Sequence, residues 1–163
     1  MIETADVSFR YIPDPASFFY DLEICFGDRC EIVGGFAPDG GPDERLLRAA
    51  IWVLTGGEEA HVLMDPQQPW GVRLTFKAVP VGPSELDGRW PWGCEISRTD
   101  LDGNNEPETE PEVLGVTPSV TQMARAVQAY AEARDRGSWE PLSLIALRAA
   151  LPLIEAETAG RGW

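Results

Sequence analysis

The segment 18–36, FFYDLEICFGDRCEIVGGF, constrains the fold more than any other stretch of this chain. Every second residue from Tyr20 to Phe26 is apolar, and most residues between them are acidic, a pattern typical of a β-strand with one buried face. Gly27 and Asp28 then mark a turn. The segment therefore predicts a β-hairpin whose buried face organises the core and whose outer face is acidic.

The length of the turn determines which side chains share a face, because a slip of one residue moves a whole set of side chains to the opposite face. A two-residue turn would set Ile24 against Glu31, whereas a three-residue turn at 27–29 sets Ile24 against Ile32. We predict the three-residue turn because it keeps the apolar residues together.

The predicted register has two consequences for the hairpin. Cys25 and Cys30 point to opposite faces, where they cannot form a disulfide. The acidic residues of the hairpin share the solvent-facing side and become candidates for contact with a partner: Asp21, Glu23 and Glu31.

The remaining apolar patterns predict an α+β fold in one domain, residues 1–163. We expect a mainly antiparallel sheet of about five or six strands. One helix follows the N-terminal hairpin, and a C-terminal helical hairpin packs on the sheet. The domain divides into a sheet with one helix, an acidic loop and the helical hairpin, at residues 1–98, 99–116 and 117–158.

Proline residues mark the expected helix starts. Pro42 is placed as the first residue of a helix that ends near Leu54. Thr117 is placed as the N-cap of the second helix, with Pro118 as its first residue. The third helix is expected to begin near Pro141 and to kink or break near Pro152.

The acidic residues of the chain are concentrated in two segments. The net charge is −14, from 13 basic and 27 acidic residues. Residues 1–44 contain 10 acidic and 2 basic residues, and residues 100–112 contain 6 acidic and no basic residues, so these segments carry the whole excess. Such a charge disfavours nucleic acid and anionic membranes as partners, because binding either of them requires a cationic protein surface. It favours a cationic protein partner, or serves only solubility.

The cysteines and the first residues of the chain indicate a compartment. The chain has three cysteines, an odd number, and they show no tight spacing. Its first residues lack the basic head and apolar run of a secretion signal. We therefore expect reduced thiols and a cytoplasmic location.

No pattern of catalytic or metal-binding residues stands out. The single histidine, His61, lies in an apolar run and is interpreted as a packed core residue. The cysteines and His61 lack the close pairs of a zinc site. Residues 100–106 resemble the start of a calcium loop, but the twelfth position is Pro111, which has no carboxylate. We therefore expect no enzymatic activity, no metal and no cofactor.

The segment 116–123, VTPSVTQM, follows an acidic loop and precedes an alanine-rich helix. Together with the acidic sheet, this arrangement resembles the bacterial immunity proteins that neutralise polymorphic toxins, in particular the deaminase-toxin type. The resemblance implies a protein that blocks the active site of a basic toxin without catalysing a reaction.

The leading hypothesis is thus a non-enzymatic binding protein, an immunity protein or inhibitor of a cationic protein. Acidic side chains would steer association, and tryptophans would anchor the interface. The candidate residues are Asp21, Glu23 and Glu31 of the hairpin, Asp100, Asp102, Glu106 and Glu108 of the loop, and Trp90 and Trp92.

Two alternatives remain open at this point. A small-ligand-binding or hydrolase-like domain would show an apolar cavity near Trp90 and Trp92. An adaptor subunit of a larger complex would show a large exposed apolar patch instead of an acidic one.

Overall fold

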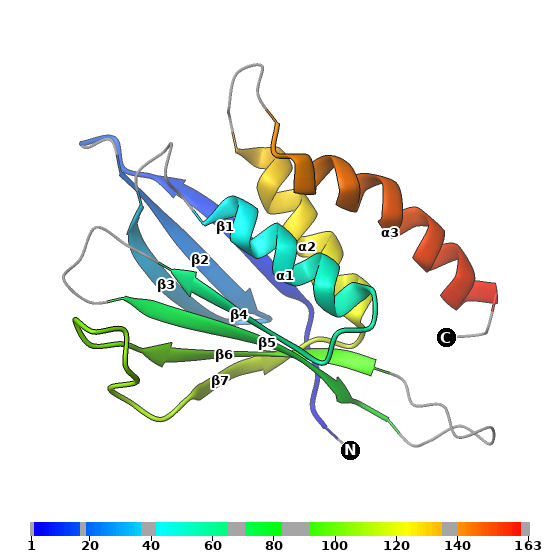
Figure 1. Cartoon of the computed structure of the whole chain (residues 1–163), viewed down its shortest axis with the longest axis horizontal. Coiled ribbons are helices and arrows are strands. Elements are labelled where there is room, and N and C mark those ends of the chain that lie inside the picture. Colours follow the sequence, from blue (N-terminus) through cyan, green and yellow to red (C-terminus); the bar gives the residue numbers. More distant parts are fainter. Residues whose placement is uncertain are drawn as a thin grey trace.

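The computed structural model of the protein describes residues 2–16, 19–36, 42–64, 71–82, 92–134 and 140–160. These residues form seven strands and three helices, which Figure 1 shows in sequence colours. The strands are β1 (Val7–Pro13), β2 (Tyr20–Phe26), β3 (Arg29–Phe36), β4 (Glu59–Met64), β5 (Val72–Pro80), β6 (Trp92–Asp100) and β7 (Glu112–Val116). The helices are α1 (Asp43–Leu54), α2 (Val120–Ala133) and α3 (Leu142–Gly160).

The strands form two antiparallel sheets, β1-β2-β3 and β4-β5-β6-β7. The α+β fold is therefore confirmed, with one helix after the hairpin and two C-terminal helices. Helix α1 packs on β4 and β5, α2 packs on β1, and α3 packs on α1 and α2, so the helices gather on one side of the sheets (Figure 1). One continuous apolar core joins both sheets to the helices, and the rings of Phe9 and Phe76 stack across it.

Strand β7 lies inside the segment that the sequence analysis assigned to the acidic loop. Leu114 and Val116 of this strand are buried, and β7 pairs with β6 at the edge of the second sheet. This segment is short and has only two buried apolar residues. Such a pattern is too weak to predict a strand from sequence.

The predicted register of the hairpin is wrong. The turn has two residues, so Ile24 pairs with Glu31, and Gly27 adopts φ +57°, the left-handed conformation that such turns require. A β-bulge between Tyr20 and Leu22 then shifts the register, so that Tyr20 pairs with Phe36, as it also would with a three-residue turn.

This register also overturns the cysteine prediction. Cys25 and Cys30 lie directly opposite each other, with Cα atoms 4.1 Å apart, and form a disulfide. Cys94 is a free cysteine and is buried. The expectation of reduced thiols therefore holds only for Cys94.

The helix boundaries match the prediction for α1 more closely than for α2. Helix α2 begins at Val120, and the Ser119 hydroxyl accepts a hydrogen bond from the Gln122 N–H (3.1 Å) as N-cap. The predicted cap, Thr117, instead accepts a hydrogen bond from the Cys94 N–H (2.9 Å) and so ties β6 to the start of α2. Helix α3 continues through Pro152.

Within the described ranges, no helix combines the length and the apolar composition that crossing a bilayer requires.

Candidate functional site

The two acidic segments meet where the hairpin crosses the second sheet. Arg29, at the start of β3, forms an ion pair with Glu112 of β7 (Nη2 to Oε1, 2.7 Å) and a weaker one with Glu31 (3.8 Å). Its Nη1 also donates a hydrogen bond to the carbonyl oxygen of Val113 (3.0 Å). Arg29 therefore joins the hairpin to Glu112, a residue 83 positions further along the sequence.

A second arginine strengthens the same contact from the other side. Arg98 of β6 donates a hydrogen bond to the carbonyl oxygen of Ile32 on the free edge of β3 (3.4 Å) and pairs with Asp100 (3.1 Å). We call this surface the β3–β7 junction and define it by Arg29, Glu31, Arg98, Asp100 and Glu112.

The loop that continues from the junction, residues 101–111, uses some of its acidic groups for its own structure. The Asp102 carboxylate accepts hydrogen bonds from the N–H groups of Asn104 (2.8 Å) and Glu106 (3.1 Å), a turn stabilised by an aspartate side chain. Glu106 and Glu108 are exposed. Of the four predicted loop residues, these two are therefore the most available to a partner.

The predicted hairpin residues do not all share one face. Asp21 and Glu23 are half-buried on the side away from the core, and Glu23 pairs with Arg10 (3.2 Å). Glu31 lies on the same side as its partner Ile24, so the prediction that it joins Asp21 and Glu23 is wrong. Ile32 occupies the outer position instead and is 54% exposed.

Trp92 lies away from the acidic residues. It begins β6, whereas Asp100 ends this nine-residue strand. The two ends of such a strand are separated by roughly 26 Å. Trp90 lies outside the described residues, so of the two tryptophans only Trp92 can be placed relative to other elements.

Trp92 borders a cavity of about 710 Å³ between the helices and the second sheet. The lining of the cavity is mostly apolar, and the volume of the cavity is within the range of small-molecule sites. The main contributions come from the end of α1, the start of α2 and the side of α3: Val53, Leu54, Val120 and Ile154, with Lys77 and Glu59 at its polar margin.

Sequence reasoning missed a buried polar cluster centred on Asp43. Its carboxylate accepts hydrogen bonds from the Tyr130 hydroxyl (2.7 Å) and from Arg134 Nε (2.9 Å). The guanidinium of Arg134 stacks over the Tyr20 ring, 4.0 Å from its centroid. Asp43 and Arg134 are only 6% and 8% exposed. In the sequence, Asp43 is only an acidic residue in the first turn of a helix, where the helix dipole already accounts for it without a buried partner.

Burial dominates the protonation of this cluster. It raises the pKa of Tyr20 to about 12, with the negative charge of Asp43 acting in the same direction. The same two causes raise the pKa of Tyr130 further. Both hydroxyls therefore stay protonated at neutral pH and serve as hydrogen-bond donors, which suits a structural clamp between β2, α1 and α2 rather than a reacting centre.

The cysteine and histidine that might form a catalytic pair lie on opposite faces of the second sheet. Cys94 pairs with Ala78 and His61 pairs with Thr75, so their side chains emerge on different sides. Burial raises the pKa of the Cys94 thiol to about 12. His61 is exposed and bonds to Thr75 (3.0 Å), so its interpretation as a core residue is wrong.

The outer side of α3 is apolar. Leu142 is 82% exposed and Leu153 is 73% exposed, and both lie on one face of the helix with Ile145. No described element of the chain covers this face, which is the feature that the adaptor alternative expects.

No protein-family model, curated protein or solved structure matches this chain significantly.

Proposed function

We propose that this protein is a non-enzymatic binding protein that contacts a cationic protein surface through the β3–β7 junction and the adjoining acidic loop. The observation that carries the proposal is the convergence of the two acidic segments, which Arg29 and Arg98 hold together. Segments that are separate in the sequence thus form one negatively charged surface.

The composition of this surface supports a steering role. Glu106, Glu108 and Glu112 are exposed acidic residues on or beside the junction. Complementary charge of this kind increases the association rate of a basic partner and disfavours acidic ones. Exposed Val113 follows Glu112 on β7 and adds apolar area near the junction, whereas exposed Ile32 faces the opposite side of β3 from Glu31.

The proposal extends to the partner class that the resemblance implies, a basic toxin domain neutralised by an immunity protein in the bacterial cytoplasm. The buried Asp43 cluster supports the non-enzymatic part of the proposal. The most strongly perturbed tyrosines of the described chain are enclosed in it and act as donors to Asp43.

Charge reversal tests the proposal. The protein is used to capture basic proteins from the lysate of its source organism, and binding of the captured partner is then measured with purified variants. Glu106→Lys with Glu108→Lys is expected to weaken binding about tenfold or more.

The matched control is Glu58→Lys with Glu59→Lys, which changes the net charge equally at the other end of the second sheet. Its binding is expected to stay within about twofold of the original protein. Equal losses of binding in both variants would show that only the total charge matters. No loss of binding in either variant would show that the acidic loop is not part of the interface.

The cavity beside Trp92 favours a second candidate function, the binding of a small molecule with an apolar body. Its volume and apolar lining meet the expectation of this alternative. A ligand screen by thermal shift tests it, with Trp92→Ala as the disrupting variant. Trp52→Ala is the control, because Trp52 is exposed on α1 and does not line the cavity. Ligands that stabilise both variants equally would contradict this function.

A further inference from the structure

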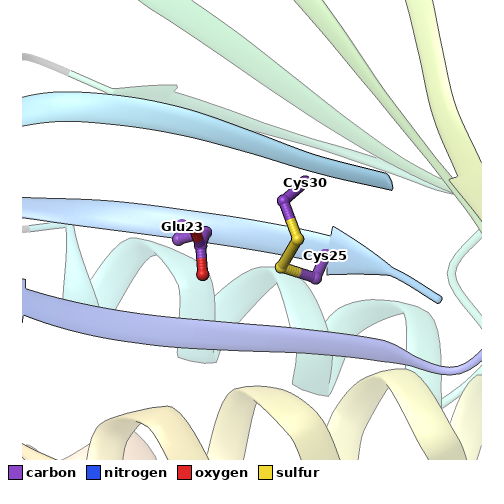
Figure 2. Close-up of side chains that lie close together, drawn as sticks. All are labelled: Glu23, Cys25 and Cys30. Carbon is purple, nitrogen blue, oxygen red and sulfur yellow. A yellow bond between two sulfur atoms is a disulfide. The ribbon is translucent and has the colours of Figure 1, made fainter. Parts of the chain in front are cut away.

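The corrected register of the hairpin brings three potential metal ligands together. Cys25 and Glu23 are two positions apart on β2 and share a face, and Cys30 lies opposite Cys25 on β3. The sulfur atoms and a carboxylate oxygen of Glu23 all lie within 4.8 Å of one another. Figure 2 shows the three side chains side by side over these two strands, with the helices behind the sheet.

Once the disulfide is reduced, the positions of these three residues suit a tetrahedral ion. Two thiolates that bind one zinc ion at 2.3 Å lie about 3.8 Å apart. Directly opposed residues of an antiparallel pair, here with Cα atoms 4.1 Å apart, place their sulfurs within that reach after small side-chain rotations. A carboxylate two residues along the same strand can then supply the third ligand.

We propose that reduction of the Cys25–Cys30 disulfide creates a binding site for a zinc-class divalent cation, with Cys25, Cys30 and Glu23 as protein ligands and water in the fourth position. A dithiol reductant supplies two electrons and two protons, the S–S bond becomes two thiols, and the reductant becomes a disulfide. Cation binding then releases the two thiol protons. The oxidised hairpin, whose sulfurs are bonded to each other, does not offer this site.

The surroundings of the group favour such an ion. Arg10 Nη1 bonds to Oε1 of Glu23 (3.2 Å), which keeps the carboxylate oriented in the way that outer partners orient metal ligands. Cys30 is exposed, so the reductant and the ion can reach the sulfurs. The excess of 27 acidic over 13 basic residues gives a negative potential that attracts cations.

Cobalt(II) is the spectroscopic probe, because it occupies zinc sites and its thiolate bonds give charge-transfer bands in the near ultraviolet. The reduced protein is expected to develop these bands with one equivalent of Co²⁺ and to lose them when Zn²⁺ is added. The oxidised protein is expected to show none.

Three variants locate the site. Cys25→Ser with Cys30→Ser should abolish the bands, Glu23→Gln should weaken Co²⁺ binding by about tenfold or more, and Cys94→Ser should change nothing. Circular dichroism verifies that each protein remains folded.

Absence of thiolate bands in the reduced protein would overturn the proposal. So would their persistence in the double serine variant, or an unchanged affinity in Glu23→Gln. Unfolding of the protein on reduction would also overturn it, since the site depends on the pairing of β2 with β3.

Discussion

The Asp43 cluster and the β3–β7 junction both pair arginine with carboxylate, but they differ in their access to water. Asp43 and Arg134 are almost fully buried, whereas the side chains of Arg29 and Glu112 are 48% and 59% exposed. The buried carboxylate is held by hydrogen bonds from within the fold, and the exposed ones retain capacity for other cations. Charge pairing alone therefore does not identify a binding surface, and burial distinguishes the structural pair from the available one.

The largest expected effect comes from removing the buried carboxylate. Asp43→Ala removes the buried carboxylate that pairs with Arg134 and accepts a hydrogen bond from Tyr130, and it should lower the free energy of unfolding by about 3–5 kcal/mol. Urea denaturation measures this change. Glu112→Ala, the matched change at the junction, should cost less than about 1 kcal/mol. Similar losses in both variants would contradict the distinction between the two regions.

The disulfide beside the junction is expected to have an intermediate effect. Cys25→Ser with Cys30→Ser removes a cross-link between residues five positions apart, and such a short loop contributes about 2 kcal/mol. Urea denaturation of the oxidised protein and the variant gives the difference. An unchanged midpoint would show that the disulfide does not stabilise the hairpin.

Alkaline pH should lower the stability of the fold through the buried tyrosines of the Asp43 cluster. Tyr20 has an ordinary pKa of 10.0 and a folded pKa of about 12, so above pH 10 the unfolded chain loses this proton first. Each such group lowers the free energy of unfolding by about 1.4 kcal/mol per pH unit until its folded pKa is reached. The stability that Tyr20 contributes is therefore complete below pH 10 and declines between pH 10 and 12, where Tyr130 acts in the same direction. Buried Cys94, whose pKa is raised from 9.0 to about 12, adds to this decline from pH 9.

Denaturation at a series of pH values checks this slope. Tyr130→Phe removes one titrating group and should make the decline shallower above pH 10. An identical slope in this variant would show that Tyr130 does not titrate as its burial requires.

The smallest effect on stability is expected at Arg29. Arg29→Gln breaks exposed ion pairs and should change the free energy of unfolding by less than about 1 kcal/mol. Partner binding should nevertheless change, because the junction loses the group that holds Glu112 beside β3. Arg48→Gln, which breaks an exposed pair on α1, is the control for binding. Equal binding by both variants would show that the junction is not part of the interface.

Local patterns predicted the elements of this fold but not its long-range contacts. The alternation from Tyr20 to Phe26 and the apolar stripe of α1 correspond to observed elements. The register failed because a β-bulge, which side-chain periodicity does not reveal, allowed a shorter turn.

The candidate site was predictable only in part for the same reason. The charge count identified both acidic segments, but the pairing of Arg29 with Glu112 depends on how the hairpin crosses β7. Two partners of Asp43, Tyr130 and Arg134, are 87 and 91 positions away, so its position in a helix turn gave no indication of them. Trp92 and the acidic residues were candidates for one interface, and the length of β6 separates Trp92 from Asp100 at its two ends.

The dependence of association rate on ionic strength tests the central proposal most directly. The proposal predicts that the rate constant for association with the captured cationic protein falls steeply as salt rises, while the dissociation rate changes little. The Glu106→Lys and Glu108→Lys double variant should show a much weaker salt dependence. An association rate that is independent of salt in the original protein would contradict the role of the acidic surface.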